Sequence, residues 1–372
     1  MLHGQTDIAD QLRQDLRQAV LSGRVKIGQR LASERNLAAR YRVPRSLVGK
    51  VLSGLTEEGL IDRQVGRGGT VVVSNRPSRP PTAARQISCL LTHFRNWSAT
   101  DNYFYDLIHG AQAAAGEAGF SLNLWSPPNG ASGEQCLDQV LKLGADVLLV
   151  EEEFDDEFVE RLCGQFLRPI VLNRPSRLPV DTVLADNPAG IHQAVTYLHH
   201  LGHRRIGYVG SPFDPNNKER EDAFVECLAE LGLSEAGNVS HIDIDSRHLA
   251  TAGLAGDDIS LLEEHRLPEP FVRDHTALIG SNDYMAKAIL NKARGLGLEV
   301  PRDLSVVGFG DFALAGQLTP KLTSVRIESR QIGQQAVRLC LDRLKNIAND
   351  NPQVERIPVE LQVRQSGDRP KE

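Results

Sequence analysis

Residues 33–73 constrain the fold of this chain most, because several local signals follow one another there in a fixed order. Ser33 is a favourable N-cap residue and opens a short helical pattern that ends near Tyr41. Pro44 then suits the first position of a second helix, since its missing N–H would have no partner there. The second helix carries an apolar stripe at helical spacing, formed by Val48, Val51, Leu52 and Leu55. This order predicts a helix-turn-helix unit.

The next segment predicts a β-hairpin with a basic tip. Residues 60–65 and 70–73 have strand patterns, and the glycine-rich run Gly66-Arg67-Gly68 forms the turn between them. Glycine lets the backbone approach a sugar–phosphate surface closely, and Arg67 can reach a minor groove or a phosphate. A helix-turn-helix followed by such a hairpin predicts a winged-helix DNA-binding domain. The alternative is a small helical domain with an ordinary surface hairpin.

The distribution of charge agrees with a DNA-binding N-terminal domain. Residues 1–85 contain 15 Lys and Arg against 7 Asp and Glu, whereas the rest of the chain contains 27 against 41. Packing of the apolar stripe leaves Arg45, Ser46 and Gly49 on the outer face of the second helix. This end of the helix enters the major groove in helix-turn-helix proteins. We therefore expect double-stranded DNA to bind the N-terminal domain.

With a further helical pattern over residues 8–22, this segment resembles the winged-helix domain of the GntR family of bacterial transcription regulators. The resemblance rests on the motifs Ser33-Glu34-Arg35, Val43-Pro44-Arg45-Ser46, Glu58-Gly59-Leu60-Ile61 and Gly66-Arg67-Gly68. It implies DNA contacts from Arg35, Arg45, Ser46, Leu47, Gly49, Lys50, Gly66, Arg67 and Gly68. Leu47 and Gly49 depart from the family, which commonly has threonine and arginine there, so the operator sequence does not carry over.

The remaining chain predicts an α/β fold. Residues 1–74 form the expected DNA-binding domain, and the Pro- and Arg-rich residues 75–86 read as an extended linker without a helical pattern. From residue 87 to 372, short apolar strands alternate with amphipathic helices, which predicts doubly wound parallel sheets.

About nine expected strands over roughly 285 residues are too many for one core, so we expect two lobes. The first lobe is expected to comprise residues 87–186 with 311–326. The second is expected to comprise residues 187–310 with 327–372.

Polar residues follow several of the predicted strands. Asn173, Asp186 and the pair Asn282-Asp283 each come directly after an apolar run. Ligands of open parallel sheets collect at the carboxyl ends of strands, and two facing lobes form a cleft. These side chains could therefore bind the hydroxyls of a small polar ligand. Each of them could equally cap the helix that follows.

Residues 87 to about 366 are similar to the effector domain of the LacI/GalR family, which is built like periplasmic sugar-binding proteins. The matching runs occur in the family's order, at residues 102–110, 186–187, 201–206, 220–224, 282–283, 303–309 and 320–326. The resemblance implies effector contacts from Tyr103, Phe104, Asn173, Asp186, Arg220, His248, Asn282, Asp283 and Asp311. Arg220 is the strongest candidate, because a guanidinium presents a rigid fork of donors.

One position in this resemblance departs from the family. An acid commonly follows the Gly-Phe of the strand at residues 303–309, whereas this chain has Gly310 there and its acid at Asp311. Either Asp311 takes over the contact, or the ligand lacks the hydroxyl that the acid holds. The ring-stacking residue expected within residues 243–253 is not obvious, and His248 is the candidate.

Other functional classes lack their sequence signals. The five cysteines form no CxxC pair and do not cluster with histidine, so we expect no metal site. There is no secretion signal and no apolar run long enough for a membrane span, so we expect a cytoplasmic protein without a membrane partner. Hydrolase and phosphate-loop motifs are missing, and we expect no catalytic residue and no cofactor.

The sequence therefore predicts a ligand-controlled transcription regulator, most simply a repressor of carbohydrate-related genes. We expect it to bind a palindromic operator as a homodimer and a sugar or sugar derivative in the interlobe cleft. One alternative effector is a non-sugar metabolite, either nucleobase-like or amino-acid-like. Two more distant alternatives are a solute-binding protein and, because GntR-type domains can precede an aminotransferase-like domain, an enzyme that uses pyridoxal phosphate.

Overall fold

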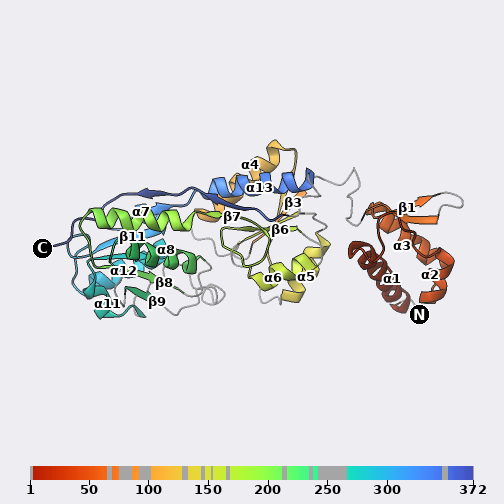
Figure 1. Ribbon diagram of the computed structural model, residues 1–372, viewed down its shortest axis with the longest axis horizontal. Coiled ribbons are helices and arrows are strands. Elements are labelled where there is room, and N and C mark those ends of the chain that lie inside the picture. The colour runs from red at the N-terminus through yellow and green to blue at the C-terminus, as the bar shows by residue number, and fades with distance from the viewer. Residues whose placement is uncertain are drawn as a thin grey trace. The chain divides into compact units, whose positions relative to one another are not determined.

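The computed structural model describes residues 3–64, 69–74, 86–91, 102–127, 133–143, 147–151, 154–164, 168–211, 216–233, 238–241, 266–345 and 351–371. The chain divides into two compact units, Met1–Ala84 and Arg85–Glu372, which are described separately below (Figure 1). Within the described residues, no helix is both long enough and apolar enough to cross a membrane.

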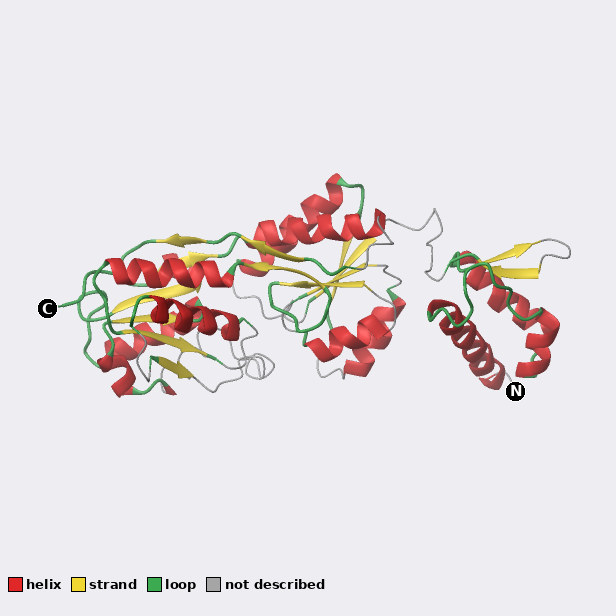
Figure 2. Cartoon of the chain, in the orientation of Figure 1, coloured by secondary structure: helices red, strands yellow, loops and turns green. Residues whose placement is uncertain are grey.

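The N-terminal unit is a three-helix domain with a hairpin (Figure 2). Its elements are α1 (His3–Leu21), α2 (Glu34–Tyr41), α3 (Arg45–Glu57), β1 (Ile61–Gln64) and β2 (Gly69–Val72). The two strands are antiparallel. The predicted helix-turn-helix and hairpin are thus confirmed, while the hairpin tip at residues 65–68 lies outside the described residues.

The predicted apolar stripe of α3 forms the core of this unit. Its four residues Val48, Val51, Leu52 and Leu55 are buried and pack with apolar residues of α1 and the hairpin. Ser33 caps α2 as expected, because its side chain accepts the Asn36 N–H at 3.3 Å. Pro44 is the N-cap residue of α3 and not its first helical residue, so the predicted start differs by one position.

The first lobe of the C-terminal unit contains a parallel sheet in the order β13-β7-β6-β5-β3-β4. Its strands are β3 (Gln86–Leu90), β4 (Ser121–Trp125), β5 (Val147–Val150), β6 (Arg168–Leu172), β7 (Asp181–Ala185) and β13 (Val354–Ile357). Helices α4 (Tyr103–Glu117) and α13 (Ser329–Lys345) cover one face, and α5 (Gly133–Lys142) and α6 (Asp156–Gly164) cover the other (Figure 1). Leu148 and Leu149 pack toward opposite faces, as strand alternation requires.

The second lobe has the strand order β14-β12-β11-β10-β8-β9, in which only β14 runs antiparallel to its neighbour among the described strands. These strands are β8 (Ile206–Gly210), β9 (Val239–His241), β10 (Ala277–Gly280), β11 (Ser305–Gly310), β12 (Thr323–Arg326) and β14 (Glu360–Gln362). Helices α7 (Asn187–His200) and α8 (Asn217–Glu230) pack on one face, and α11 (Glu269–Asp274) and α12 (Asp283–Gly295) on the other.

The division of the chain between the lobes differs from the one predicted. Because β12 pairs with β11, residues 311–326 belong to the second lobe and not to the first. Helix α13 and β13 then return to the first lobe, where β13 pairs with β7, before β14 joins the second. Apolar periodicity locates a strand but does not identify its neighbour, which explains the wrong assignment.

Helices α4 and α13 are in backbone contact, and this contact positions their first residues. A Cβ atom at Gly110 of α4 would lie 2.0 Å from the carbonyl oxygen of Arg330, and one at Gly333 of α13 would lie 2.0 Å from that of Leu107. The missing side chains therefore let the two helices approach closely. As a result, the start of α13, at the crossover from β12, is held against α4.

Candidate functional site

The first candidate site is the exposed side of α3 in the N-terminal unit. Arg45, Ser46 and Lys50 are exposed there, and Gly49 is half-buried. Arg35 of α2 is also exposed, whereas Leu47 is partly buried and packs against the core. The predicted contacts Gly66, Arg67 and Gly68 lie outside the described residues.

The N-terminus of α3 is suited to a phosphate. Its N-cap residue Pro44 makes no side-chain capping hydrogen bond, and the first turn contains no acidic residue. The N–H groups at a helix start carry a partial positive charge and favour anions. Arg45 occupies this first turn, so a guanidinium and the helix start can act on the same part of a DNA strand.

The second candidate site is a cavity of about 250 Å³ between the two lobes of the C-terminal unit. Three segments form its wall: the start of α4, the turn after β11, and the crossover from β12 into α13. The lining residues are Asn102, Tyr103, Asp106, Gly310, Asp311, Phe312, Arg326, Ile327, Glu328, Ser329 and Arg330. Of the predicted effector contacts, Tyr103 and Asp311 are in this wall.

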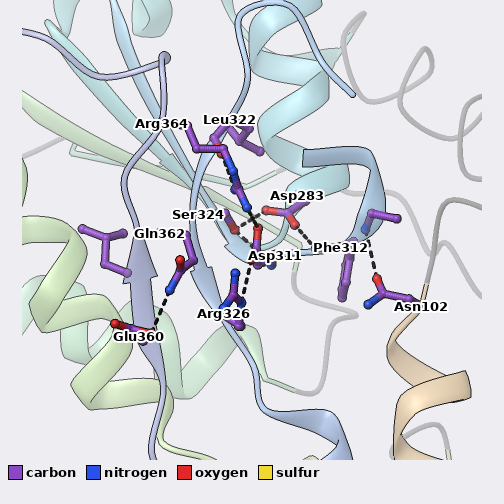
Figure 3. A network of polar contacts seen from close by, with 12 residues as sticks. Asn102, Asp283, Asp311, Phe312, Leu322, Ser324, Arg326, Glu360, Gln362 and Arg364 are labelled. Carbon is purple, nitrogen blue, oxygen red and sulfur yellow. Dashed lines mark hydrogen bonds and ion pairs between the residues drawn. The ribbon is translucent and has the colours of Figure 1, made fainter. Parts of the chain in front are cut away.

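Asp311 lines the cavity, but two arginines already hold its carboxylate (Figure 3). Arg326 Nε donates to Oδ2 at 2.9 Å, and Arg364 Nη2 lies 2.6 Å from Oδ1. The backbone of Asp311 is in the left-handed region, with φ of 52°. A ligand that donated hydrogen bonds to this carboxylate would have to compete with both guanidinium groups.

Gly310 makes room for an aromatic ring in the wall. Its φ is +123°, and a Cβ atom there would lie 2.7 Å from the ring of Phe312. That ring is 6.3 Å from Tyr103, across the two lobes, and 5.7 Å from Tyr284 of α12. A larger residue at position 310 would displace this ring. The glycine, which departs from the family pattern, therefore allows an aromatic face in the cavity wall.

Asp283 supports the wall from behind and does not line the cavity of this structure, and a direct effector contact from it stays a prediction. It is wholly buried, and its carboxylate accepts the Phe312 N–H at 2.6 Å and the Ser324 hydroxyl at 2.5 Å (Figure 3). Burial raises the pKa of Asp283 to about 7, although these two hydrogen bonds favour the ionised form.

Polar contacts that join the two lobes include an ion pair between Arg356 of β13 and Glu219 of α8, and two hydrogen bonds made by asparagine side chains. Asn102 at the start of α4 accepts the Ala313 N–H at 3.0 Å through its side-chain oxygen. Asn216 before α8 donates to the backbone oxygen of Asn173 at 2.9 Å. Asn173 is buried, has a positive φ of 50° and does not line the cavity of this structure, and a direct effector contact from it stays a prediction.

Arg220 is buried at the lobe boundary within a polar network. Its Nε donates to Asn187 Oδ1 at 2.9 Å and its Nη1 to the Ser281 oxygen at 2.7 Å. The guanidinium also lies 4.0 Å above the ring of Phe309. Arg220 does not line the cavity of this structure, and a direct effector contact from it stays a prediction.

The remaining predicted contacts have structural roles or lie outside the description. Asp186 caps α7 by accepting the Ala189 N–H, and Asn282 caps α12 by accepting the Met285 N–H. The capping alternative is thus confirmed for both. Phe104 packs edge-on against Tyr103, with ring centroids 4.9 Å apart, and His248 is not among the described residues.

Several lining residues were not predicted, namely Asn102, Asp106, Phe312, Arg326, Ile327, Glu328, Ser329 and Arg330. Arg326 ends β12, but the strand before it contains Thr323 and Ser324, so no apolar run singled it out as one did Asn173. The other residues line the wall only because segments that are far apart in the sequence pack together in the fold. Within the described residues, no group of three or more His, Cys, Asp or Glu could hold a metal ion.

Comparisons with known proteins match a domain in each of the two units. Residues 8–72 match the gntR family of bacterial regulatory proteins, and residues 195–367 match a periplasmic binding protein-like domain. The arabinose metabolism transcriptional repressor of Geobacillus stearothermophilus is 25% identical over 351 residues, which cover 91% of this chain and 92% of that protein. The transcriptional repressor PurR of Aliivibrio fischeri (strain MJ11) is 26% identical over 275 residues, or 72% of this chain and 79% of that protein.

A solved structure shows the same fold. The transcriptional regulator CelR in complex with cellobiose has a TM-score of 0.66 at 22% identity, covering 91% of this chain and all of that one. The matches to the arabinose repressor and to CelR extend over both units of the chain. The chain therefore joins a segment that matches the gntR family of regulatory proteins to a periplasmic binding protein-like domain, and it is similar over most of its length to the arabinose repressor.

Proposed function

We propose that this protein is a ligand-responsive repressor of carbohydrate-related genes that binds a palindromic operator as a homodimer. The observation that carries the proposal is the combination, in one chain, of a gntR-family domain with an exposed basic helix start and a cavity between two lobes. The full-length relative of Geobacillus stearothermophilus is a repressor, which supports the same role here.

The effector we propose is a small sugar or sugar derivative in the interlobe cavity. A volume of about 250 Å³ is just below the range of about 300–1,000 Å³ for drug-sized ligands, and it suits a single ring with few substituents. Asn102, Ser329 and Arg330 offer polar groups to hydroxyls, and Phe312 offers a face to the C–H side of a ring. The cellobiose in the CelR complex is a precedent for a sugar in this fold.

A nucleobase-like effector is a second candidate, and the aromatic wall favours it. Phe312 and Tyr103 both line the cavity, while the carboxylate of Asp311 is paired with two arginines. A flat heterocycle would stack on such rings and would need fewer carboxylate partners than a polyol.

The effector can act only through a difference in its affinity for two lobe arrangements. Closure would change the separation of the two recognition helices in a dimer, which must match half-sites a fixed number of helical turns apart. A coupling free energy of about 1–3 kcal/mol is typical of such regulators. The interlobe hydrogen bond from Ala313 to Asn102 borders the cavity and is where a ligand would bias the arrangement.

Two measurements test the proposal. In-vitro selection from genomic fragments should recover a palindromic site, and the absence of any sequence-dependent retention would reject the repressor function. A thermal-shift screen of pentoses, hexoses, sugar acids, sugar phosphates and nucleobases should identify the effector, because ligand at about 100 times its Kd stabilises a protein by about 2.7 kcal/mol. Stabilisation by nucleobases alone would replace the sugar by the second candidate.

A further inference from the structure

The guanidinium of Arg63 joins three elements of the N-terminal unit. Arg63 lies in β1, where its Nη1 donates to the Ser53 hydroxyl at 3.1 Å and to the Gly49 oxygen of α3 at 3.5 Å. Its Nη2 forms an ion pair with Glu34, the first residue of α2. The Arg63 side chain nevertheless stays 40% exposed. It is therefore held at the surface of the domain and not within its core.

Arg63 is on the side of α3 that carries the predicted DNA contacts. Arg45, Gly49 and Ser53 are four residues apart in succession, so they follow one another along one side of the helix. Gly49 leaves an opening in this row, because a Cβ atom built there meets nothing within 4 Å. The guanidinium of Arg63 lies beside that opening, because it donates hydrogen bonds to the backbone oxygen of Gly49 and to the Ser53 hydroxyl.

The ion pair between Arg63 and Glu34 can be broken at little cost in free energy. The ion pair with Glu34 is partly exposed, with 28% of the Glu34 side chain accessible, and such surface pairs are weak in water. A DNA phosphate offers a guanidinium a bidentate, charge-assisted contact that is stronger. The negative charge of Glu34 is also on this side of the domain. It would repel a DNA phosphate unless the guanidinium of Arg63 lay between the carboxylate and the phosphate.

We propose that Arg63 is a DNA-contacting residue, which retains Ser53 and exchanges Glu34 for a backbone phosphate when the domain binds DNA. Arg63 of β1 thereby supplies a positive charge at the position on α3 where Gly49 has no side chain. This inference rests on the DNA-binding role of the gntR-family domain, but it needs neither the operator nor the effector. Phosphate contacts are independent of sequence and can be counted from the salt dependence of binding.

The test is fluorescence anisotropy of the full-length protein with a labelled DNA duplex of arbitrary sequence, between about 50 and 200 mM salt. We expect Arg63→Ala to weaken binding and to reduce the slope of log K against log salt by about 0.9 for each phosphate that Arg63 neutralises. Arg63→Lys should keep most of the slope. Glu34→Gln should strengthen binding several-fold without reducing the slope, because it removes the competing carboxylate.

Arg13→Ala is the matched control, since Arg13 forms a comparable exposed ion pair with Glu58 away from Gly49. It should leave the slope unchanged. A loss of affinity in Arg63→Ala without a change of slope would show that Arg63 only braces the hairpin and would overturn the inference. So would a parallel loss of affinity in Glu34→Gln. Absence of DNA binding by the unsubstituted protein would instead reject the proposed function itself.

Discussion

At the scale of single residues, Gly310 and Asp283 determine the shape of the cavity wall. Gly310 has a backbone conformation that other residues rarely adopt, and it leaves the space that the Phe312 ring fills. Asp283 fixes the backbone of the same segment through the Phe312 N–H. The aromatic face thus depends on two residues that contribute little or no surface to the cavity.

Gly310→Ala should destabilise the C-terminal unit. A non-glycine residue held in such backbone strain costs about 1–3 kcal/mol, and the new methyl group would also displace the ring of Phe312. Differential scanning calorimetry should show a lower Tm for that unit. Gly316→Ala is the control, because a Cβ atom there meets nothing within 4 Å. Equal Tm values for the two variants would contradict the account of Gly310.

Asp283→Asn should make stability less dependent on pH. Burial raises the pKa of Asp283 to about 7, well above the usual range of an aspartate, so the folded state retains a proton that the unfolded state releases in this interval. The resulting stabilisation is full below about pH 4 and is lost as the pH rises through 7. The Tm of Asp283→Asn minus that of the natural protein should therefore increase from pH 4 to pH 8. The exposed Asp274→Asn should show no such trend.

At the scale of elements, the contact between α4 and α13 holds the two helix starts that border the cavity. Gly333→Ala should cost about 1–3 kcal/mol, since its methyl group would lie 2.0 Å from the backbone oxygen of Leu107 and force the helices apart. Gly116→Ala, in α4 but with open space around it, should instead be neutral or stabilising. Urea denaturation of the two variants would measure the difference, and equal midpoints would contradict the close approach.

Sequence periodicity predicted most elements but not all. The alternation of apolar strands and helices from residue 87 onward is confirmed, for example by the fully buried run of β5. Strands β13 and β14 were not predicted, because they are short edge strands that contain only one buried residue. Their existence follows from pairing with β7 and β12, which is a property of the folded sheet.

The candidate sites were predictable to different degrees for a related reason. The predicted DNA contacts Arg45 and Ser46 lie within one helix, so the local spacing of apolar residues was sufficient to predict that both are exposed. The cavity wall joins Asn102 to residues more than two hundred positions later, and no local pattern connects them. The sequence places Asp283 after an apolar run, but its burial behind Phe312 is a tertiary property that no local pattern predicts.

At the scale of the whole molecule, the two units should carry separable functions. Arg45→Ala should weaken operator binding by about 1–3 kcal/mol if it reads a base edge, while leaving ligand-induced thermal shifts unchanged. Arg220→Ala should do the reverse, retaining operator affinity but losing the ligand response. Parallel anisotropy and thermal-shift measurements would check both. An Arg220→Ala protein that still released DNA normally with ligand would remove Arg220 from the effector response.

The last strands of the chain have a consequence for biosynthesis. Strand β13 completes the edge of one sheet and β14 the edge of the other, although both follow all the other described strands of these sheets in the sequence. Neither lobe can thus be completed before residue 354 has been synthesised, and the second lobe not before residue 360. The N-terminal unit, by contrast, contains all of its own elements and can fold while translation continues, so a nascent chain would acquire its DNA-binding domain well before its sensor.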